Sequence, residues 1–407
     1  MIAQLKLSPP GRNVSRAGGR IVHLVLDGAG GLRDAATGKT ALELAHTPHL
    51  DRVTRTAACG QLELVSPGIR PGSVPGHLAL FGYDPLKFHL ERGVLAAIEI
   101  NFDLRDGDIA ACVNFATIRA NGDISDRRPE GISTALARRL CKKIRTAVKL
   151  DFDGEYFLEP VGEHRAVLVL RGRNLAADIH DTDPQSTGVP PREPEARSVA
   201  ARSTAQLLRS FLADVHTVLD DEDQGNAMLL RGFQRYTPLP TLDQRFGLQG
   251  MCIARSPLYR RLSRLLGIDV TAAPDDLDST FELLAQHYNE AHNFYLLHAK
   301  VAGDAVAETD FACKVAVLEA VDRHIPALLK LHPEVLVVST DHSTCVGIAG
   351  HSWHPVPVLI YAPGTHADAV DHFDEVACRR GGLGLLPGKL LMGLALAHAT
   401  RLSQFGA

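Results

Sequence analysis

The stretch VLVVSTDH, residues 335–342, decides the fold class. An apolar, β-branched run that ends in a polar Asp-His pair is typical of a buried strand in a parallel sheet. Ahead of it, apolar residues recur at three- and four-residue spacing and predict one amphipathic helix between 313 and 329, built on Val315, Leu318, Val321, Ile325 and Leu328. A helix that leads directly into such a strand indicates a βαβ unit, and therefore an α/β fold.

Working outward, several more short apolar runs end in polar or glycine residues. They are IVHLVLDG at 21–28, MCIARSP at 251–257, NFYLLHAK at 293–300 and PVPVLIYAPG at 355–364. Together with the first stretch they predict a parallel sheet flanked by helices. The middle of the chain differs, because strand-like IAACVNFATI and HRAVLVLRG surround a helix with Ile132, Leu136, Leu140 and Ile144 on one stripe. A Pro-rich loop at about 181–196 is predicted to be a surface excursion.

We therefore expect three parts: an N-terminal extension at 1–19, a sheet domain formed by 20–104 and 235–407, and a smaller α+β domain inserted at 105–234. The 407 residues suffice for two domains, and 45% hydrophobic with 22% charged residues is ordinary for a globular protein. A net charge of -4 argues against nucleic acid as a partner, and no run is long enough to span a membrane. Seven scattered cysteines without a C-x-x-C pair favour reduced thiols and a cytoplasmic location, while the oligomeric state is left open.

Metal-binding side chains gather where two of the predicted strands end. Asp27 follows the first strand, and Asp341 with His342 follows the strand at 335–340. Because ligands collect at the carboxyl ends of parallel strands, this mixed oxygen and nitrogen set suits manganese, zinc or cobalt. His351 and His354 add further imidazoles nearby. For Asp27 alone, an ordinary turn after a strand is the alternative.

A second constellation is SPGIRPGSVPGHLALFGYDP, residues 66–85. Its glycines and prolines fix a tight loop around Ser73, which His77 follows four residues later. A serine hydroxyl becomes a nucleophile when a base or a metal stabilises its alkoxide. The alternative for Ser73 is a helix N-cap.

These segments, in order over about nine-tenths of the chain, resemble the archaeal-type, cofactor-independent phosphoglycerate mutases of the alkaline-phosphatase superfamily. The matching motifs are DGAGG (27–31), KTALELAHTPHLD (39–51), SPGIRPGS (66–73), GHLALFGYDP (76–85), NFAT (114–117), DRR (126–128), EHRAVLVLRG (163–172), NAMLLRGF (226–233), DHST (341–344), HSWHPVPVLI (351–360) and GGLG (381–384).

The resemblance implies a role for each matching residue. Ser73 would be the nucleophile that accepts and returns the phosphoryl group. Asp27, Ser73, Asp341 and His342 would hold one divalent metal, Mn²⁺ or alternatively Zn²⁺ or Co²⁺, and His351 would belong to a second. The inserted domain would bind a small phosphorylated carboxylate through Asn114, Asp126, Arg127, Arg128, His164, Arg165 and Arg231. For any one of these arginines, an ordinary solvated or ion-paired side chain is the alternative.

The chain also departs from the family pattern near the second metal. Where relatives place an aspartate and, four residues later, a histidine or glutamate, this chain has Gly303 and Ala307. Asp304 and Glu308 keep that spacing one residue later, and they could restore the site only if the segment is a loop, because in a helix the shift would turn them by about 100°. Arg260 stands where the family commonly has a phosphate-contacting lysine.

The sequence therefore leads to an enzyme that interconverts 2- and 3-phosphoglycerate, with closure of the inserted domain over one or two metal ions excluding water. Two alternatives remain open. One is a relative that acts on another phospho- or phosphonocarboxylate. The other is a non-catalytic member that binds a ligand or a partner.

Overall fold

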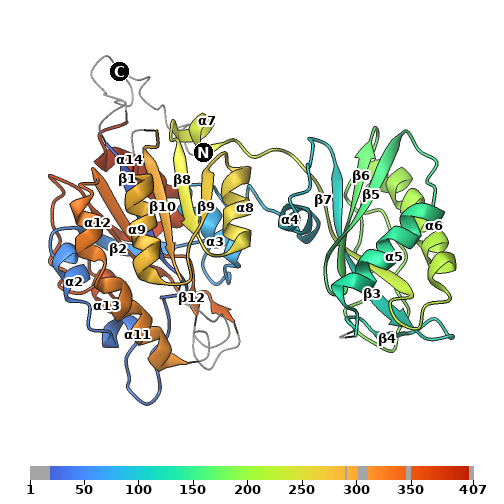
Figure 1. Cartoon of the computed structure of the whole chain (residues 1–407), viewed down its shortest axis with the longest axis horizontal. Coiled ribbons are helices and arrows are strands. Elements are labelled where there is room, and N and C mark those ends of the chain that lie inside the picture. The colour runs from blue at the N-terminus through green and yellow to red at the C-terminus, as the bar shows by residue number, and fades with distance from the viewer. Residues whose placement is uncertain (1–18, 130, 289–290, 301–309, 345–349, 403–407) are drawn as a thin grey trace. The chain divides into compact units, whose positions relative to one another are not determined.

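The computed structural model describes residues 19–129, 131–288, 291–300, 310–344 and 350–402 (Figure 1). The chain divides into two compact units, unit 1 from residues 1–89 and 239–407 and unit 2 from residues 90–238. Unit 2 begins at Leu90, ahead of the expected residue 105, because helix α4 (Arg92–Glu99) packs on strands β3 (Ile109–Ile118) and β7 (Ala227–Arg235). Most of the expected extension at 1–19 lies outside the described residues.

Unit 1 is built on a mixed, mostly parallel sheet of eight strands. In spatial order these are β15 (Gly384–Pro387), β2 (Ala58–Glu63), β14 (Val356–Tyr361), β11 (Val335–Thr340), β1 (Ile21–Leu26), β10 (Phe294–Ala299), β8 (Gly250–Ala254) and β9 (Asp269–Ala272). Strand β1 lies between β10 and β11 and is parallel to both, in the register Leu26 to Ala299 and Leu26 to Thr340. The carboxyl ends of these three strands therefore meet at one edge of the sheet.

Helices cover both faces of this sheet (Figure 1). The main apolar core packs one face against α1 (Ala41–Leu44), α2 (Pro48–Thr54), α9 (Leu277–His287), α11 (Phe311–Asp322), α12 (Ile325–Lys330) and α13 (Glu375–Cys378). The remaining helices of unit 1 are α3 (Ser73–Leu80), α7 (Leu242–Phe246), α8 (Pro257–Leu265) and α14 (Leu391–His398). Within the described ranges, no helix is both long and apolar enough to cross a membrane.

Unit 2 has its own antiparallel sheet and its own core. Strand β3 pairs with β7, with β6 (Arg165–Gly172) and with the short β4 (Ile124–Asp126), and β5 (Gly154–Gly162) pairs with β6. Helices α5 (Thr134–Ala147) and α6 (Arg202–Leu219) bury their apolar stripes with Ile109, Ala111, Val113 and Phe115 of β3. Residues that alternate with these, such as Cys112 and Asn114, point to the opposite face of the strand.

Two expectations from the sequence are wrong in detail. The single helix expected between 313 and 329 is two helices, α11 and α12, because Pro326 has no amide N–H and stands at the start of the second. The strand at 356–361 is antiparallel to both of its neighbours, so the sheet is mixed and not wholly parallel. The expected α/β class, with a large mostly parallel sheet flanked by helices, is confirmed.

Candidate active site

Three strand ends and the start of one helix bring the candidate residues of unit 1 together. Asp27 follows β1, Asp341 and His342 follow β11, and His298 lies near the end of β10, on the other side of β1. The oxygen and nitrogen atoms of Asp27, Asp341 and His342 all lie within 4.8 Å of one another. Ser73 is the first residue of α3, and this helix packs beside the group so closely that a Cβ added to Gly76 would stand 2.4 Å from the Asp341 carbonyl oxygen.

Asp341 is the buried centre of this group, with no exposed surface. Its Oδ2 atom lies 3.0 Å from His342 Nδ1, 3.7 Å from His298 Nε2 and 3.7 Å from His77 Nδ1. Its Oδ1 atom accepts a hydrogen bond of 2.9 Å from the Gly28 amide. Burial alone would raise the pKa of Asp341, but the charge of His342 and the close imidazoles of His298 and His342 outweigh it and hold the pKa well below its usual range. The carboxylate is therefore ionised at neutral pH.

The Ser73 hydroxyl is not used to cap its helix. The N-cap of α3 is Gly72, and no side chain caps that end, which removes the N-cap alternative for Ser73. The Ser73 carbonyl accepts a hydrogen bond of 2.9 Å from His77 Nδ1. Burial raises the pKa of Tyr259, and the nearby Ser73 side chain only partly opposes that rise. The Tyr259 phenol donates to Asp341 Oδ2 over 3.3 Å, so it lies between the serine and the buried carboxylate.

Asp27 is an ion-paired residue and not a simple turn residue. Its Oδ2 atom lies 3.0 Å from Lys300 Nζ, and its Oδ1 atom lies 4.0 Å from the Nε2 atoms of both His298 and His342. His351 stacks on His342, with ring centroids 3.7 Å apart and planes 15° from parallel. The short pairing of β12 (Ser343–Thr344) with β13 (His351–Ser352) brings these two rings together.

The donor set of this group fits a divalent cation. The Nδ1 and Nε2 atoms of His298 and the Nδ1 atom of His342 are buried, and none of them has a hydrogen-bond partner in the part of the chain that the structure describes. His342 Nδ1 is near Asp341 but not in a hydrogen-bonding direction. His351 Nδ1 donates to the Pro71 carbonyl over 2.9 Å, so its Nε2 atom carries the free lone pair that a metal needs. Carboxylate oxygens and imidazole nitrogens are the ligands that Mn²⁺, Zn²⁺ and Co²⁺ share.

A second cluster, which is basic, lies in unit 2. Burial lowers the pKa of His164, and Arg128, Arg165 and Arg231 add to that effect, which places the four side chains in one electrostatic neighbourhood. Arg165 is held by Glu99 through bonds of 3.1 and 3.0 Å. Arg128, Arg165 and Arg231 are thus each close enough to His164 to affect its charge.

Asn114 and Arg231 carry buried polar atoms that are not satisfied. Both side-chain polar atoms of Asn114, which is fully buried in β3, lack a partner among the described residues. The Arg231 Nε atom also lacks a partner among the described residues, and Arg231 is only 9% exposed. Because buried polar groups in folded proteins are nearly always paired, these atoms favour a ligand at this face.

The remaining predicted residues are placed differently. Arg127 is paired with Asp183 through Nε and Nη2, and Asp126 is exposed and accepts from the Arg128 amide. Arg260 turns its guanidinium onto the Ala254 carbonyl at 2.8 Å, at the end of β8. Asp304 and Glu308, together with Gly303 and Ala307, lie outside the described residues.

The sequence did not single out several neighbours of the two clusters. His298, Lys300 and Tyr259 surround the two aspartates of unit 1, and Glu99 and Asp183 hold arginines of unit 2. A signal existed for His298, a lone histidine inside an otherwise apolar strand. None existed for Asp183, whose polar, Pro-rich surroundings are typical of an exposed loop.

The chain is similar to known proteins over nearly its whole length. Residues 54–224 match the family model described as 2,3-bisphosphoglycerate-independent phosphoglycerate mutase. The chain is 39% identical to a probable 2,3-bisphosphoglycerate-independent phosphoglycerate mutase of Aquifex aeolicus, over 97% of this chain and 98% of that protein. The counterpart of Deinococcus radiodurans is 40% identical, over 95% and 96% of the two chains.

Among solved structures, a cofactor-independent phosphoglycerate mutase from Thermoplasma acidophilum aligns with a TM-score of 0.75. It is 27% identical and covers 94% of this chain and all of that chain, 100%. These findings confirm the resemblance that the sequence motifs indicated. The chain therefore belongs to the enzyme family of 2,3-bisphosphoglycerate-independent phosphoglycerate mutases.

Proposed function

We propose that this chain interconverts 2- and 3-phosphoglycerate by transferring the phosphoryl group to Ser73 and back. The observation that carries the proposal is the placement of Ser73. Its side chain is close enough to Tyr259 to affect the pKa of that phenol, the phenol contacts the buried, ionised Asp341, and the Ser73 hydroxyl is not used as a helix cap. A serine in such a place can act as a nucleophile towards a phosphoryl group.

The proposal includes a divalent metal, with Mn²⁺ as the first choice. Asp27, Ser73, Asp341 and His342 would hold one ion, and His351 would contribute to a second. When bound, such an ion supplies positive charge that lowers the pKa of a ligating hydroxyl and stabilises the charge of the transferring group. Lys300, 3.0 Å from Asp27, orients that carboxylate.

Unit 2 would supply the binding groups for the rest of the substrate. Guanidinium groups recognise carboxylate and phosphate oxygens through paired hydrogen bonds, and the cluster of Arg128, Arg165 and Arg231 offers several such donors. Asn114, buried and unsatisfied, is suited to accept from or donate to a substrate hydroxyl or carboxylate.

The test compares the wild-type chain with Ser73→Ala and with a matched control, Ser66→Ala, which removes a hydroxyl from the same segment. Interconversion of 2- and 3-phosphoglycerate is measured with Mn²⁺ present and after chelation. We expect S73A to lose activity by at least about 1,000-fold, S66A to stay within about twofold, and chelation to abolish turnover. Intact-mass measurement after mixing with substrate should show a phosphorylated form in the wild type and none in S73A.

The results also separate the two alternatives that the sequence left open. Activity in S73A equal to the wild type would refute the nucleophile assignment. Ser73-dependent turnover of a different phospho- or phosphonocarboxylate, without phosphoglycerate turnover, would indicate a specialised relative. Binding without turnover of any such acid would indicate a non-catalytic member.

A further inference from the structure

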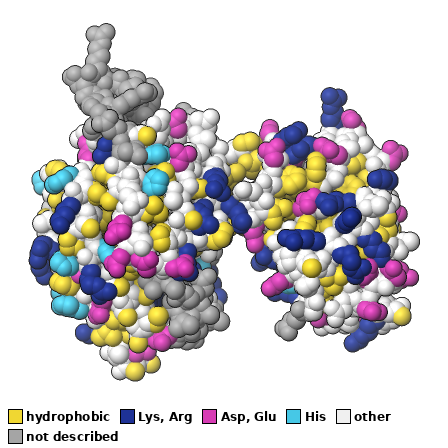
Figure 2. All heavy atoms as spheres, viewed as in Figure 1, with side chains coloured by type: hydrophobic (Ala, Val, Ile, Leu, Met, Phe, Trp, Pro, Cys, Tyr) yellow, Lys and Arg dark blue, Asp and Glu magenta, His cyan; other side chains and the backbone are white. Residues whose placement is uncertain are grey.

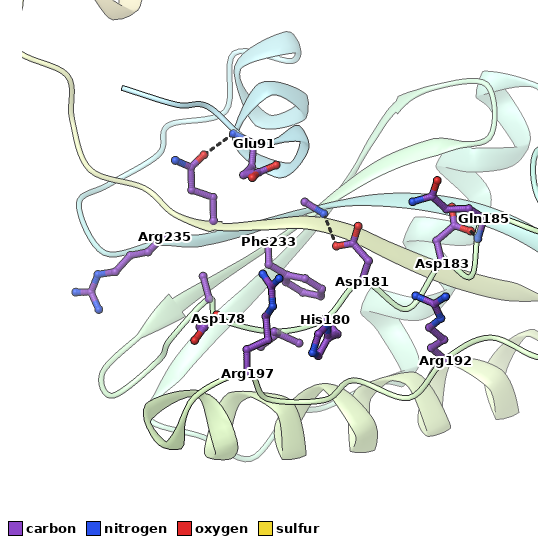
Figure 3. A pocket seen from close by; sticks show the side chains of 14 residues that line it. Glu91, Asp178, His180, Asp181, Asp183, Gln185, Arg192, Arg197, Phe233 and Arg235 are labelled. Carbon is purple, nitrogen blue, oxygen red and sulfur yellow. Dashed lines mark hydrogen bonds between the residues drawn. The ribbon is translucent and has the colours of Figure 1, made fainter. Parts of the chain in front are cut away.

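The Pro-rich loop of unit 2 is attached to strand β7 on both sides of Arg231. The Thr182 amide donates to the Leu230 carbonyl over 2.9 Å, and the Leu230 amide donates to Thr182 Oγ1 over 2.8 Å. On the other side, the Gly232 amide donates to Asp181 Oδ1 over 2.8 Å (Figure 3). The start of this loop is therefore fixed to the strand, contrary to the expectation of a surface excursion.

Asp183, the next residue of this loop, is buried and shared by two arginines. Its side chain has no exposed surface. It accepts from Arg127 Nε over 2.9 Å and from Arg127 Nη2 over 2.7 Å, and it lies 3.7 Å from Arg231 Nη1. Burial alone would raise the pKa of Asp183, but the hydrogen bond from Arg127 and that from the Gln185 amide keep it below its usual value.

This arrangement leaves part of each guanidinium available to a ligand. Asp183 occupies the edge of Arg127 formed by Nε and Nη2, so Nη1 carries none of these bonds. Arg231 turns Nη1 towards Asp183, while its buried Nε atom has no partner within the described residues. A carboxylate that holds a guanidinium from behind fixes the direction in which the free donors point.

The Asp183 carboxylate also lies beside a cavity. Asp183 lines a cavity of about 510 Å³ in unit 2, together with Asp181 and the exposed Arg192 (Figure 3). Although it lines this cavity, its carboxylate is already taken by Arg127. We therefore assign Asp183 to the arginines and not to a ligand of this cavity.

We propose that Asp183 is a positioning residue that orients Arg127 and Arg231 to receive an anionic oxygen of the substrate. The identity of that anion, a carboxylate or phosphate group of phosphoglycerate, rests on the proposed function. Asp183 itself does not touch the substrate. Without it, two long side chains must be ordered at the moment of binding, and we expect this to weaken binding roughly 10- to 100-fold.

Unit 2 offers a close match for a control. Asp108 is also buried, 2% exposed, and binds Arg171 with the same geometry, through Nε over 2.9 Å and Nη2 over 2.7 Å. Asp108→Asn and Asp183→Asn thus remove the same charge from the same kind of pair. Arg171 lies near the opposite end of β6 from Arg165, so only one of the two changes should affect the substrate.

The experiment measures KM and kcat for 3-phosphoglycerate, and the melting temperature, for the wild type, D183N and D108N with Mn²⁺. We expect D183N to raise KM at least about 10-fold with a smaller change in kcat, and D108N to change KM less than about twofold, although both lower the melting temperature. Equal changes of KM in the two variants, or an unchanged KM in D183N, would overturn the proposal. Should D183N not fold, Asp183→Glu keeps the charge and displaces the two guanidinium groups, and an unchanged KM in that variant has the same meaning.

A second arm does not depend on turnover. Crystal structures of the wild type and of D183N without ligand should show Arg127 and Arg231 displaced or without defined density in the variant. Guanidinium groups that keep their wild-type positions in D183N refute the positioning role. If the wild type does not turn over phosphoglycerate, the proposed function fails, while this arm and the calorimetric affinity of D183N for inorganic phosphate still decide the role of Asp183.

Discussion

We expect substitution of the buried Lys314 to cause a large loss of stability. The side chain is 7% exposed, and its ammonium group donates to the Gly30 carbonyl over 2.7 Å and to the Thr344 carbonyl over 2.9 Å. Those carbonyls belong to the loops that follow β1 and β11, which carry Asp27 and Asp341. Through these two hydrogen bonds, Lys314 therefore connects the two segments that carry Asp27 and Asp341.

The expected cost follows from these contacts. Lys314→Met keeps the aliphatic stem but removes two hydrogen bonds from a charged donor, each worth about 1.5–3 kcal/mol. The substitution also relieves the burial of a charge, which offsets part of that loss. We expect a net decrease of about 3 kcal/mol in the free energy of unfolding of unit 1, or about 1 M in the urea midpoint.

The decrease in the stability of unit 1 can be measured through Trp353, because it is the chain's one tryptophan and lies in unit 1. Its fluorescence during urea unfolding reports on that unit alone. The control is Lys389→Met, which breaks a half-exposed pair with Asp84 at 2.6 Å and should cost about 0–1 kcal/mol. A midpoint for K314M equal to that of K389M would refute the reasoning.

Three further predictions concern the surroundings of Asp341. Tyr259→Phe removes the phenol that contacts Asp341, and kcat should fall about 10-fold while the melting temperature changes little. Gly76→Ala places a Cβ 2.4 Å from the Asp341 carbonyl oxygen and should lower both the melting temperature and the Mn²⁺ affinity measured by calorimetry, whereas Gly162→Ala, with nothing within 4 Å, should not. Burial lowers the pKa of His23 from 6.5 to about 3, so between these values the unfolded state binds a proton that the native state does not. The free energy of unfolding should therefore fall as the pH falls through that window, by up to about 1.4 kcal/mol per unit, and His23→Gln should lose this part of the slope in urea titrations.

The sequence could predict the sites that depend on strand ends. Asp27, Asp341 and His342 each follow an apolar run, and parallel strands deliver their carboxyl ends to one edge, so local pattern and sheet geometry together placed them in one group. His298 and Tyr259 could not be assigned in this way. His298 lies within a buried strand and Tyr259 on a helix, and only tertiary packing brings their rings to 4.5 Å from one another beside Asp341.

The direction of β14 and the burial of Asp183 could not be predicted from a local sequence pattern. An apolar run of six residues has the same pattern whether its strand is parallel or antiparallel to its neighbours. The direction of the strand depends on the connection that precedes it and not on its own sequence. The Pro-rich composition around Asp183 indicates a loop, but the burial of one carboxylate within that loop depends on two distant arginines. The break at Pro326 did have a signal, because proline inside a helical pattern ends or kinks the helix.

The order of strands in unit 1 has a consequence during synthesis. Strand β1 leaves the ribosome early, whereas its neighbours β10 and β11 begin at Phe294 and Val335. At ribosomal speed the segment Ile21–Leu26, which is fully buried in the folded sheet, waits roughly 15 to 50 s for a partner, during which the contiguous Leu90–Pro238 can already fold. The nascent chain should therefore be most prone to aggregation, and most in need of a chaperone, between the completion of unit 2 and the emergence of β10.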